Sequence, residues 1–194
     1  GKMFATAGSD RVVHLWNYPE GERLLSFKGH RKAVVAIAFN PKTPMLATAS
    51  QDMSILLWDL NEPLSLRQPK RLEGHNYIVS GLDFTIDGKA LLSVSRDKTA
   101  RLWESASGRM LRIIHGENRA LLSVSMNFDN TLIAVSNLGP EIKILSYPDD
   151  LPELISIELP DNSTGIESGE TETFSAGVTE ASFENETSVD EEDL

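Results

Sequence analysis

Two sets of side chains in this sequence combine the residue types of a hydrolase active site. Each set has a His, a hydroxyl and an Asp, with 22 residues from the His to the Asp: His30, Thr48 and Asp52, then His75, Ser93 and Asp97. An imidazole held by a carboxylate could activate such a hydroxyl as a nucleophile. The repetition argues against this chemistry, because a catalytic set rarely occurs twice at identical spacing beside the same neighbouring residue.

That neighbour is a Trp, which follows each Asp by six residues as Trp58 and Trp103. A buried indole N–H needs an acceptor, which a Thr or Ser hydroxyl supplies. The hydroxyl can also bond one imidazole nitrogen, and the Asp receives the proton of the other. We therefore expect two structural hydrogen-bonded sets and no catalytic residues.

The sequence leaves open which hydroxyl serves. Ser50 and Ser95 have the same strand parity as Thr48 and Ser93, so both pairs face the same side of their strands. We prefer the earlier pair because the first repeat has Thr6 at that place.

The sets lie in a repeat of 42 to 45 residues. Three aligned segments define it: ATAGSDRVVHLW ending at Trp16, ATASQDMSILLW ending at Trp58, and LSVSRDKTARLW ending at Trp103. Short segments rich in Val, Ile, Leu, Ala and Ser alternate with turn signals, without a sustained helical period. This pattern predicts an all-β chain with about four strands in each repeat.

A fourth unit keeps the strand pattern and loses the motif residues. Glu117 stands at the place of the His, Gly139 at that of the Asp and Leu145 at that of the Trp. The first unit lacks its innermost strand. We expect the four units to occupy residues 1–28, 29–73, 74–115 and 116–159.

These motifs resemble the WD-repeat β-propeller family, whose units of about 40 to 45 residues carry Gly-His near the start and Trp-Asp at the end. Gly29-His30 and Gly74-His75 match the first element, and Trp58-Asp59 matches the second. The resemblance covers residues 1–159. It implies a propeller of four-stranded antiparallel blades, in which the two sets are structural tetrads that tie a turn to a strand. It implies no metal and no cofactor.

The resemblance also implies a non-catalytic scaffold or adaptor that docks peptides or partner domains on the propeller faces. In the family, the docking residues lie just after the Gly-His and just before the turn Asp. The corresponding positions here are Ser9, Arg31, Gln51, Asn76, Tyr77, Arg96 and Arg119. Arginines beside a Tyr favour an acidic or phosphorylated peptide. We expect a place in a multiprotein complex of the cytoplasm or nucleus. The alternative is a regulatory propeller of a larger protein or enzyme with its catalytic part elsewhere.

Charge divides the chain into a neutral body and an acidic tail. The sequence has 18 Lys and Arg against 29 Asp and Glu, and residues 161–194 hold 11 of the acidic residues and no basic one. This composition predicts that residues 160–194 form a disordered tail rich in Glu, Ser and Thr. Residues 177–185 resemble residues 33–41, so they are also a candidate strand of another blade.

The same composition excludes several classes of protein. The absence of Cys excludes disulfide scaffolds and thiolate metal sites. The longest apolar run, Ala33–Phe39, has seven residues, and a membrane helix needs about 20. The neutral body lacks the basic stripe of a nucleic-acid-binding protein, so nucleic acid is not expected as a direct ligand.

The strand count amounts to about three and three-quarter blades, while propellers close with about four to eight. An open arc leaves sheet edges unpaired. We therefore expect the C-terminal part of a longer chain. The alternative is an arc that closes by dimerisation or against a partner.

Overall fold

The apolar segments of the sequence form β-strands in a computed structural model, which describes residues 3–61, 68–116, 118–146 and 155–158. No helix occurs within these ranges, so they hold no helical segment that could cross a membrane. The acidic tail at 160–194 and the candidate strand at 177–185 lie outside the described residues.

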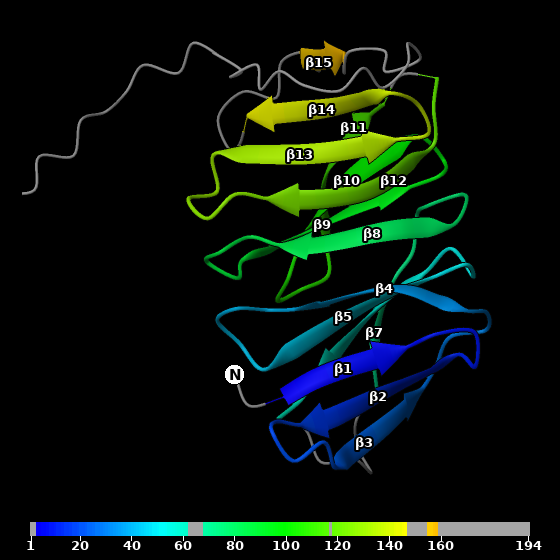
Figure 1. The fold of residues 1–194 in the computed structure, drawn as a ribbon, viewed down its shortest axis with the longest axis vertical. Coiled ribbons are helices and arrows are strands. Elements are labelled where there is room, and N and C mark those ends of the chain that lie inside the picture. The colour runs from blue at the N-terminus through cyan, green and yellow to red at the C-terminus, as the bar shows by residue number, and fades with distance from the viewer. Residues whose placement is uncertain (1–2, 62–67, 117, 147–154, 159–194) are drawn as a thin grey trace, which may run out of the picture. The chain divides into compact units, whose positions relative to one another are not determined.

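The strands (Figure 1) are β1 (Met3–Ala7), β2 (Val12–Asn17), β3 (Arg23–Lys28), β4 (Val34–Phe39), β5 (Met45–Ser50), β6 (Ile55–Asp59), β7 (Lys70–Leu72), β8 (Val79–Phe84), β9 (Ala90–Ser95), β10 (Thr99–Glu104), β11 (Met110–His115), β12 (Leu121–Met126), β13 (Leu132–Asn137), β14 (Glu141–Ser146) and β15 (Ile155–Glu158).

Antiparallel pairing groups these strands into four sheets in chain order. The first blade has three strands, β1 to β3, and the next three blades have four each: β4 to β7, β8 to β11 and β12 to β15. Within each blade, strands that follow one another in the sequence are paired, because short turns join them. The predicted fold class, an all-β propeller architecture of four-stranded antiparallel blades, is confirmed.

The first strands of successive four-stranded blades lie side by side. β8 contacts β4 on one side and β12 on the other, as Figure 1 shows. The turns that follow these strands lie on one face of the blades, at the left of Figure 1. The β1–β2, β5–β6, β9–β10 and β13–β14 turns lie on the other face, at the right, which we call the loop face.

Apolar side chains fill the space between successive blades. Phe27 of the first blade stacks on Trp58 of the second, with ring centroids 5.0 Å apart. Trp103 of the third blade packs in a cluster with Leu57 of the second. Val135 of the fourth blade packs in a cluster with residues of the third. Because blades cover both sides of the central strands, β9 is buried at all six of its residues, including the hydroxyls of Ser93 and Ser95 on one of its faces.

Hydrogen bonds between turns add to this packing. The Asn40 side-chain amide donates to the carbonyl of Gly88 at 2.8 Å, which joins the second blade to the third. The amide of Ile86 donates to Asn130 Oδ1 at 2.7 Å, which joins the third blade to the fourth. The blades therefore meet through polar contacts at one rim as well as through apolar cores.

Gly81 of β8 tests how closely two blades approach. A Cβ atom at this position would lie 2.9 Å from Val94 Cγ2 and 3.1 Å from the Cα atom of Ser123 in the next blade. We expect Gly81→Ala to lower the free energy of unfolding by about 1–3 kcal/mol in urea titrations, because a backbone atom has to move. Gly8→Ala is the control, since no atom lies within 4 Å of its Cβ position. An equal loss in both variants contradicts the close approach.

Candidate functional site

The four residues of the first set lie in one chain of hydrogen bonds in the second blade. The indole N–H of Trp58 donates to Thr48 Oγ1 at 3.1 Å. Thr48 Oγ1 lies 2.8 Å from Nε2 of His30, and Nδ1 of His30 lies 3.2 Å from Asp52 Oδ2. The side chains of His30 and Asp52 are only 1% and 4% exposed.

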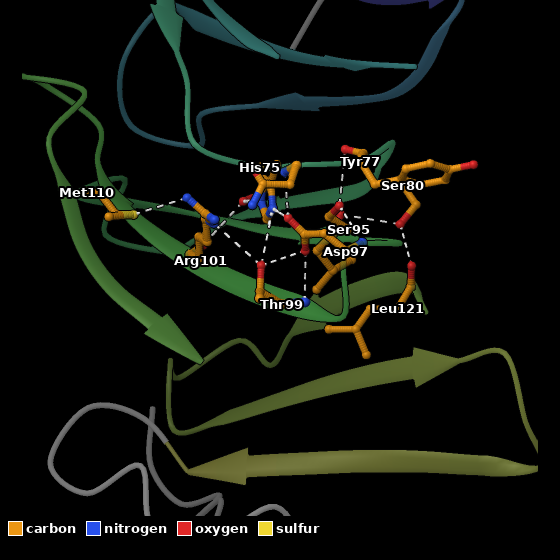
Figure 2. Close-up of polar contacts among 12 residues, drawn as sticks. His75, Tyr77, Ser80, Ser95, Asp97, Thr99, Arg101, Met110 and Leu121 are labelled. Atoms are coloured by element: carbon orange, nitrogen blue, oxygen red, sulfur yellow. Dashed lines mark hydrogen bonds and ion pairs between the residues drawn. The ribbon is translucent and has the colours of Figure 1, made fainter. Parts of the chain in front are cut away.

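The third blade repeats this arrangement. Trp103 donates its indole N–H to Ser93 Oγ at 2.8 Å, and Ser93 Oγ lies 2.8 Å from His75 Nε2. His75 Nδ1 lies 2.8 Å from Asp97 Oδ2 (Figure 2). We refer to each set of four residues as a tetrad.

The strands and turns of a blade position the four members. In the second blade, Thr48 lies on β5 and Trp58 on β6, and these two strands are paired. His30 comes before β4, and Asp52 lies in the turn between β5 and β6. Asp52 Oδ2 also accepts the backbone amide of Arg31 at 2.7 Å. The tetrad therefore ties the Gly-His loop to the β5–β6 turn.

The glycine of the Gly-His motif has a conformational reason in the third blade. Gly74 has a φ of +149°, a conformation that favours glycine. A Cβ atom there would lie 2.2 Å from Arg101 Nη1. Figure 2 shows Arg101 beside His75, with its guanidinium 3.6 Å from the sulfur of Met110.

The later hydroxyls bond the backbone and not the indole. Ser50 Oγ donates to the Lys32 carbonyl at 3.0 Å, and Ser95 Oγ donates to the Tyr77 carbonyl at 3.2 Å (Figure 2). Each also accepts the amide of the turn Asp at 3.0 Å. The structure thus places both candidate hydroxyls near the tetrad, in different roles.

Two further side chains that bond the turn carboxylates were missed by the sequence analysis. Ser54 and Thr99 each donate a hydroxyl proton to Oδ1 of the turn Asp at 2.6 Å. Both stand two residues after that Asp, a spacing at which Ser and Thr commonly close turns. The Asp-x-Ser/Thr spacing in the sequence could therefore have predicted these two hydrogen bonds.

Hydrogen bonds keep the turn carboxylates ionised. Burial acts to raise the pKa of Asp52, but donors from Ser54 and Arg31 and the nearby His30 outweigh it and lower the pKa to about 2. The pKa of Asp97 is also lowered, because the bonds from His75, Thr99 and Asn76 outweigh its burial. For His30, burial is the largest effect and lowers the pKa below 6.5, against the attraction of Asp52.

This arrangement is suited to holding loops rather than to attacking a substrate. Thr48 and Ser93 are both 0% exposed, and their oxygens already accept an indole proton. A substrate carbonyl has no path to within attacking distance of these oxygens. Among the described residues, no group of three or more His, Asp or Glu could hold a metal ion.

The first and fourth blades depart from the tetrad. In the first, Trp16 donates to Thr6 Oγ1 at 2.9 Å, and Asp10 lies 3.6 Å from His14. In the fourth, Glu117 and the side chain of Leu145 lie outside the described residues. Gly139 lies in the β13–β14 turn, near the Arg119 guanidinium.

The residues expected to bind partners lie on the loop face. All seven are exposed: Ser9, Arg31, Gln51, Asn76, Tyr77, Arg96 and Arg119. Backbone bonds bring the turns to the Gly-His loops, from the Gln51 amide to the Ala33 carbonyl at 3.0 Å and from the Arg96 amide to the Ile78 carbonyl at 2.9 Å. No ion pair among the described residues includes any of the three arginines.

Comparison with known proteins gives a match to a family model and matches to individual proteins. A family model described as "WD domain, G-beta repeat" matches residues 21–59 and 66–104. Each match runs from the last strand of one blade to the Trp strand of the next. A sequence repeat therefore straddles two blades.

Similar curated proteins are fungal nuclear distribution proteins. PAC1 of Arthroderma benhamiae is 32% identical over 169 residues, which cover 75% of this chain and 36% of that protein. PAC1 of Fusarium vanettenii is 32% identical over 135 residues, covering 64% and 30%. nudF of Aspergillus niger is 30% identical over 128 residues, covering 64% and 28%. The chain spans about a third of the length of these relatives.

Ser93→Ala tests the centre of a tetrad. We expect it to lower the free energy of unfolding by about 1–3 kcal/mol, because the indole N–H and the imidazole lose a shared buried partner. Ser80→Ala is the control, since Ser80 is part-buried and bonds only backbone carbonyls. Chemical denaturation of both variants is the measurement, and a larger loss for Ser80→Ala contradicts the expectation.

Acid should weaken the second blade in two steps. A group with a lower pKa when folded binds fewer protons than in the unfolded chain, so its stabilising effect is lost as the pH falls. For His30 the loss begins as the pH drops below 6.5, and for Asp52 it begins below 3.8. We expect a melting temperature that falls with pH through both windows, with Asp52 contributing on the order of 1 kcal/mol. His30→Gln should flatten the upper window and change the lower one much less, because His30 is the weakest of the groups that lower the pKa of Asp52. A profile unchanged by this substitution contradicts the assignment.

Proposed function

We propose, starting from the fact that this chain belongs to the WD-repeat family, that it is a non-catalytic scaffold or adaptor for partner proteins. Proteins of this family bind other proteins within complexes. The buried hydroxyls of the tetrads support a structural role for the two triad-like sets. The relatives are nuclear distribution proteins, so we infer that the complex acts in that process, in the cytoplasm or at the nucleus.

The docking surface that we propose is the loop face. The observation that carries it is the exposure of Arg31, Arg96 and Arg119 with no carboxylate partner among the described residues. Tyr77, which is 52% exposed, stands between them in the sequence and adds a flat apolar ring. Guanidinium groups bind phosphate and carboxylate in a bidentate manner. An acidic or phosphorylated peptide is the partner that fits this surface.

The tetrads supply the rigidity that such a surface needs. Asp52 holds the backbone amide of Arg31, and Asp97 holds that of Asn76 at 2.9 Å. The backbone beneath the docking side chains is thus fixed before a partner arrives, which lowers the entropic cost of binding.

The second candidate is a regulatory propeller within a larger protein. Its premise is that the docking surface serves a catalytic part elsewhere in the same protein. Both candidates use the same docking surface, so the experiment below applies to either.

Charge reversal tests the loop face. We expect Arg96→Glu to weaken binding of a fluorescein-labelled phosphoserine peptide by about tenfold in anisotropy titrations, and Arg31→Glu to add to the loss. Lys42→Glu is the matched control, because Lys42 is exposed on the turn between β4 and β5, at the opposite face.

The unphosphorylated peptide should bind more weakly than its phosphorylated form. Equal effects of Arg96→Glu and Lys42→Glu would indicate a response to net charge alone and would contradict the proposed surface.

A further inference from the structure

A cavity opens between the second and third blades, on the face opposite to the loop face. It has a volume of about 610 Å³ and lies between residues 43–45, residues 87–89 and the ends of β6 and β10. A smaller cavity of about 180 Å³ shares Met45, Asp59, Ser105 and Ala106 with it. We call the two together the junction groove.

One position beside the groove differs between the second and third blades. Leu60 and Ser105 each follow the Trp of their blade by two residues. Their amides make equivalent bonds, from Leu60 to the Pro44 carbonyl at 2.7 Å and from Ser105 to the Lys89 carbonyl at 2.9 Å. Leu60 packs against the apolar cluster between the first and second blades. The smaller Ser105 stands at the equivalent place in the third blade, where it lines the groove.

The Ser105 hydroxyl has no partner within the described residues. Its residue is 4% exposed, and its oxygen makes no hydrogen bond. Buried hydroxyls nearly always form a hydrogen bond, because a buried hydroxyl without a partner has lost its hydrogen bonds to water and gained none in the protein. Ser105 lines both parts of the junction groove, and its oxygen, which has almost no exposed surface, lies beneath the wall of the groove.

The charges around the groove favour a cation. Asp59, Asp87 and Glu104 line it. Lys89 lies 3.7 Å from Asp87, and Arg109 lies 3.6 Å from Glu104. Asp59 is in no ion pair of the described residues and bonds only the amide of Asn61, through Oδ1 at 2.8 Å.

A lysine of this chain already uses one acceptor of the groove. Lys70 Nζ donates to the Ala106 carbonyl at 2.6 Å, in the smaller cavity. Asp59 lines both cavities. Of the three acidic residues that line the groove, it is the one without an ion-pair partner among the described residues.

We propose that the junction groove binds a Lys or Arg side chain from an extended segment of a partner protein. The aliphatic part of that side chain lies along Pro44, Met45 and Ala106. Its cationic end meets the Asp59 carboxylate, beside the wall that Ser105 helps to form. This docking site is separate from the loop face and has the opposite preference for charge.

Three capped Gly/Ser peptides that differ only in a central Arg, Lys or citrulline test the proposal. Citrulline has nearly the shape of Arg and no charge. In NMR titrations of the full ¹⁵N-labelled chain, we expect the Arg and Lys peptides to shift the amides of Asp59, Lys89 and Ser105. The expected dissociation constant is on the order of 1 mM, and the citrulline peptide should bind about fivefold more weakly.

Ser105→Leu should abolish these shifts, because the larger side chain would occupy the groove. Asp59→Asn, at an exposed position, should weaken binding about fivefold and keeps the test decisive if Ser105→Leu does not fold. Glu20→Gln is the matched control, an equal change of charge at an exposed position in the turn between β2 and β3.

Equal binding of the Arg and citrulline peptides, equal effects of Asp59→Asn and Glu20→Gln, or shifts that do not cluster at the groove would each overturn the proposal. Arg96→Glu on the loop face should leave the shifts unchanged. This variant therefore separates a failure of the junction groove from a failure of the proposed function.

Discussion

The indole N–H of each buried tryptophan has to meet an acceptor inside the protein, and much of this structure follows from that need. Trp58 and Trp103 are each 2% exposed, with their rings packed toward the preceding blade. The acceptor is a hydroxyl on the neighbouring central strand. That hydroxyl holds a His, and the His holds an Asp in a turn. One buried polar atom therefore couples the packing between blades to the conformation of the loop face.

This coupling separates rigid backbone from free side chains. The turn carboxylates bind main-chain amides, while the side chains beside those amides remain exposed. The loop face can thus present arginines on a fixed frame, which suits recognition of anionic groups. The opposite face is built by turns without tetrads, and there Ser105 lines a groove between the second and third blades.

The blades that lack a full tetrad show what the tetrad does not do. The first and fourth blades still form antiparallel sheets, and apolar clusters still join them to their neighbours. Val135 takes the central-strand place of the hydroxyl in the fourth blade, where it is buried against the third. Strand pairing and apolar packing are therefore sufficient for a blade, and the tetrad adds a specific link from sheet to loop.

The sequence by itself determined the fold class, the repeat and the His, Asp and Trp of the two tetrads, because turn signals, strand alternation and recurring spacing are local properties of the chain. Alternation shows which face of a strand a residue occupies and not which partner it meets there. Only the tertiary structure therefore assigned the indole to Thr48 and the backbone to Ser50, two residues of equal parity. The contact of Asn40 with Gly88 and the open space beside Ser105 also arise where two blades meet. Such positions depend on the distance between blades, which no single repeat encodes.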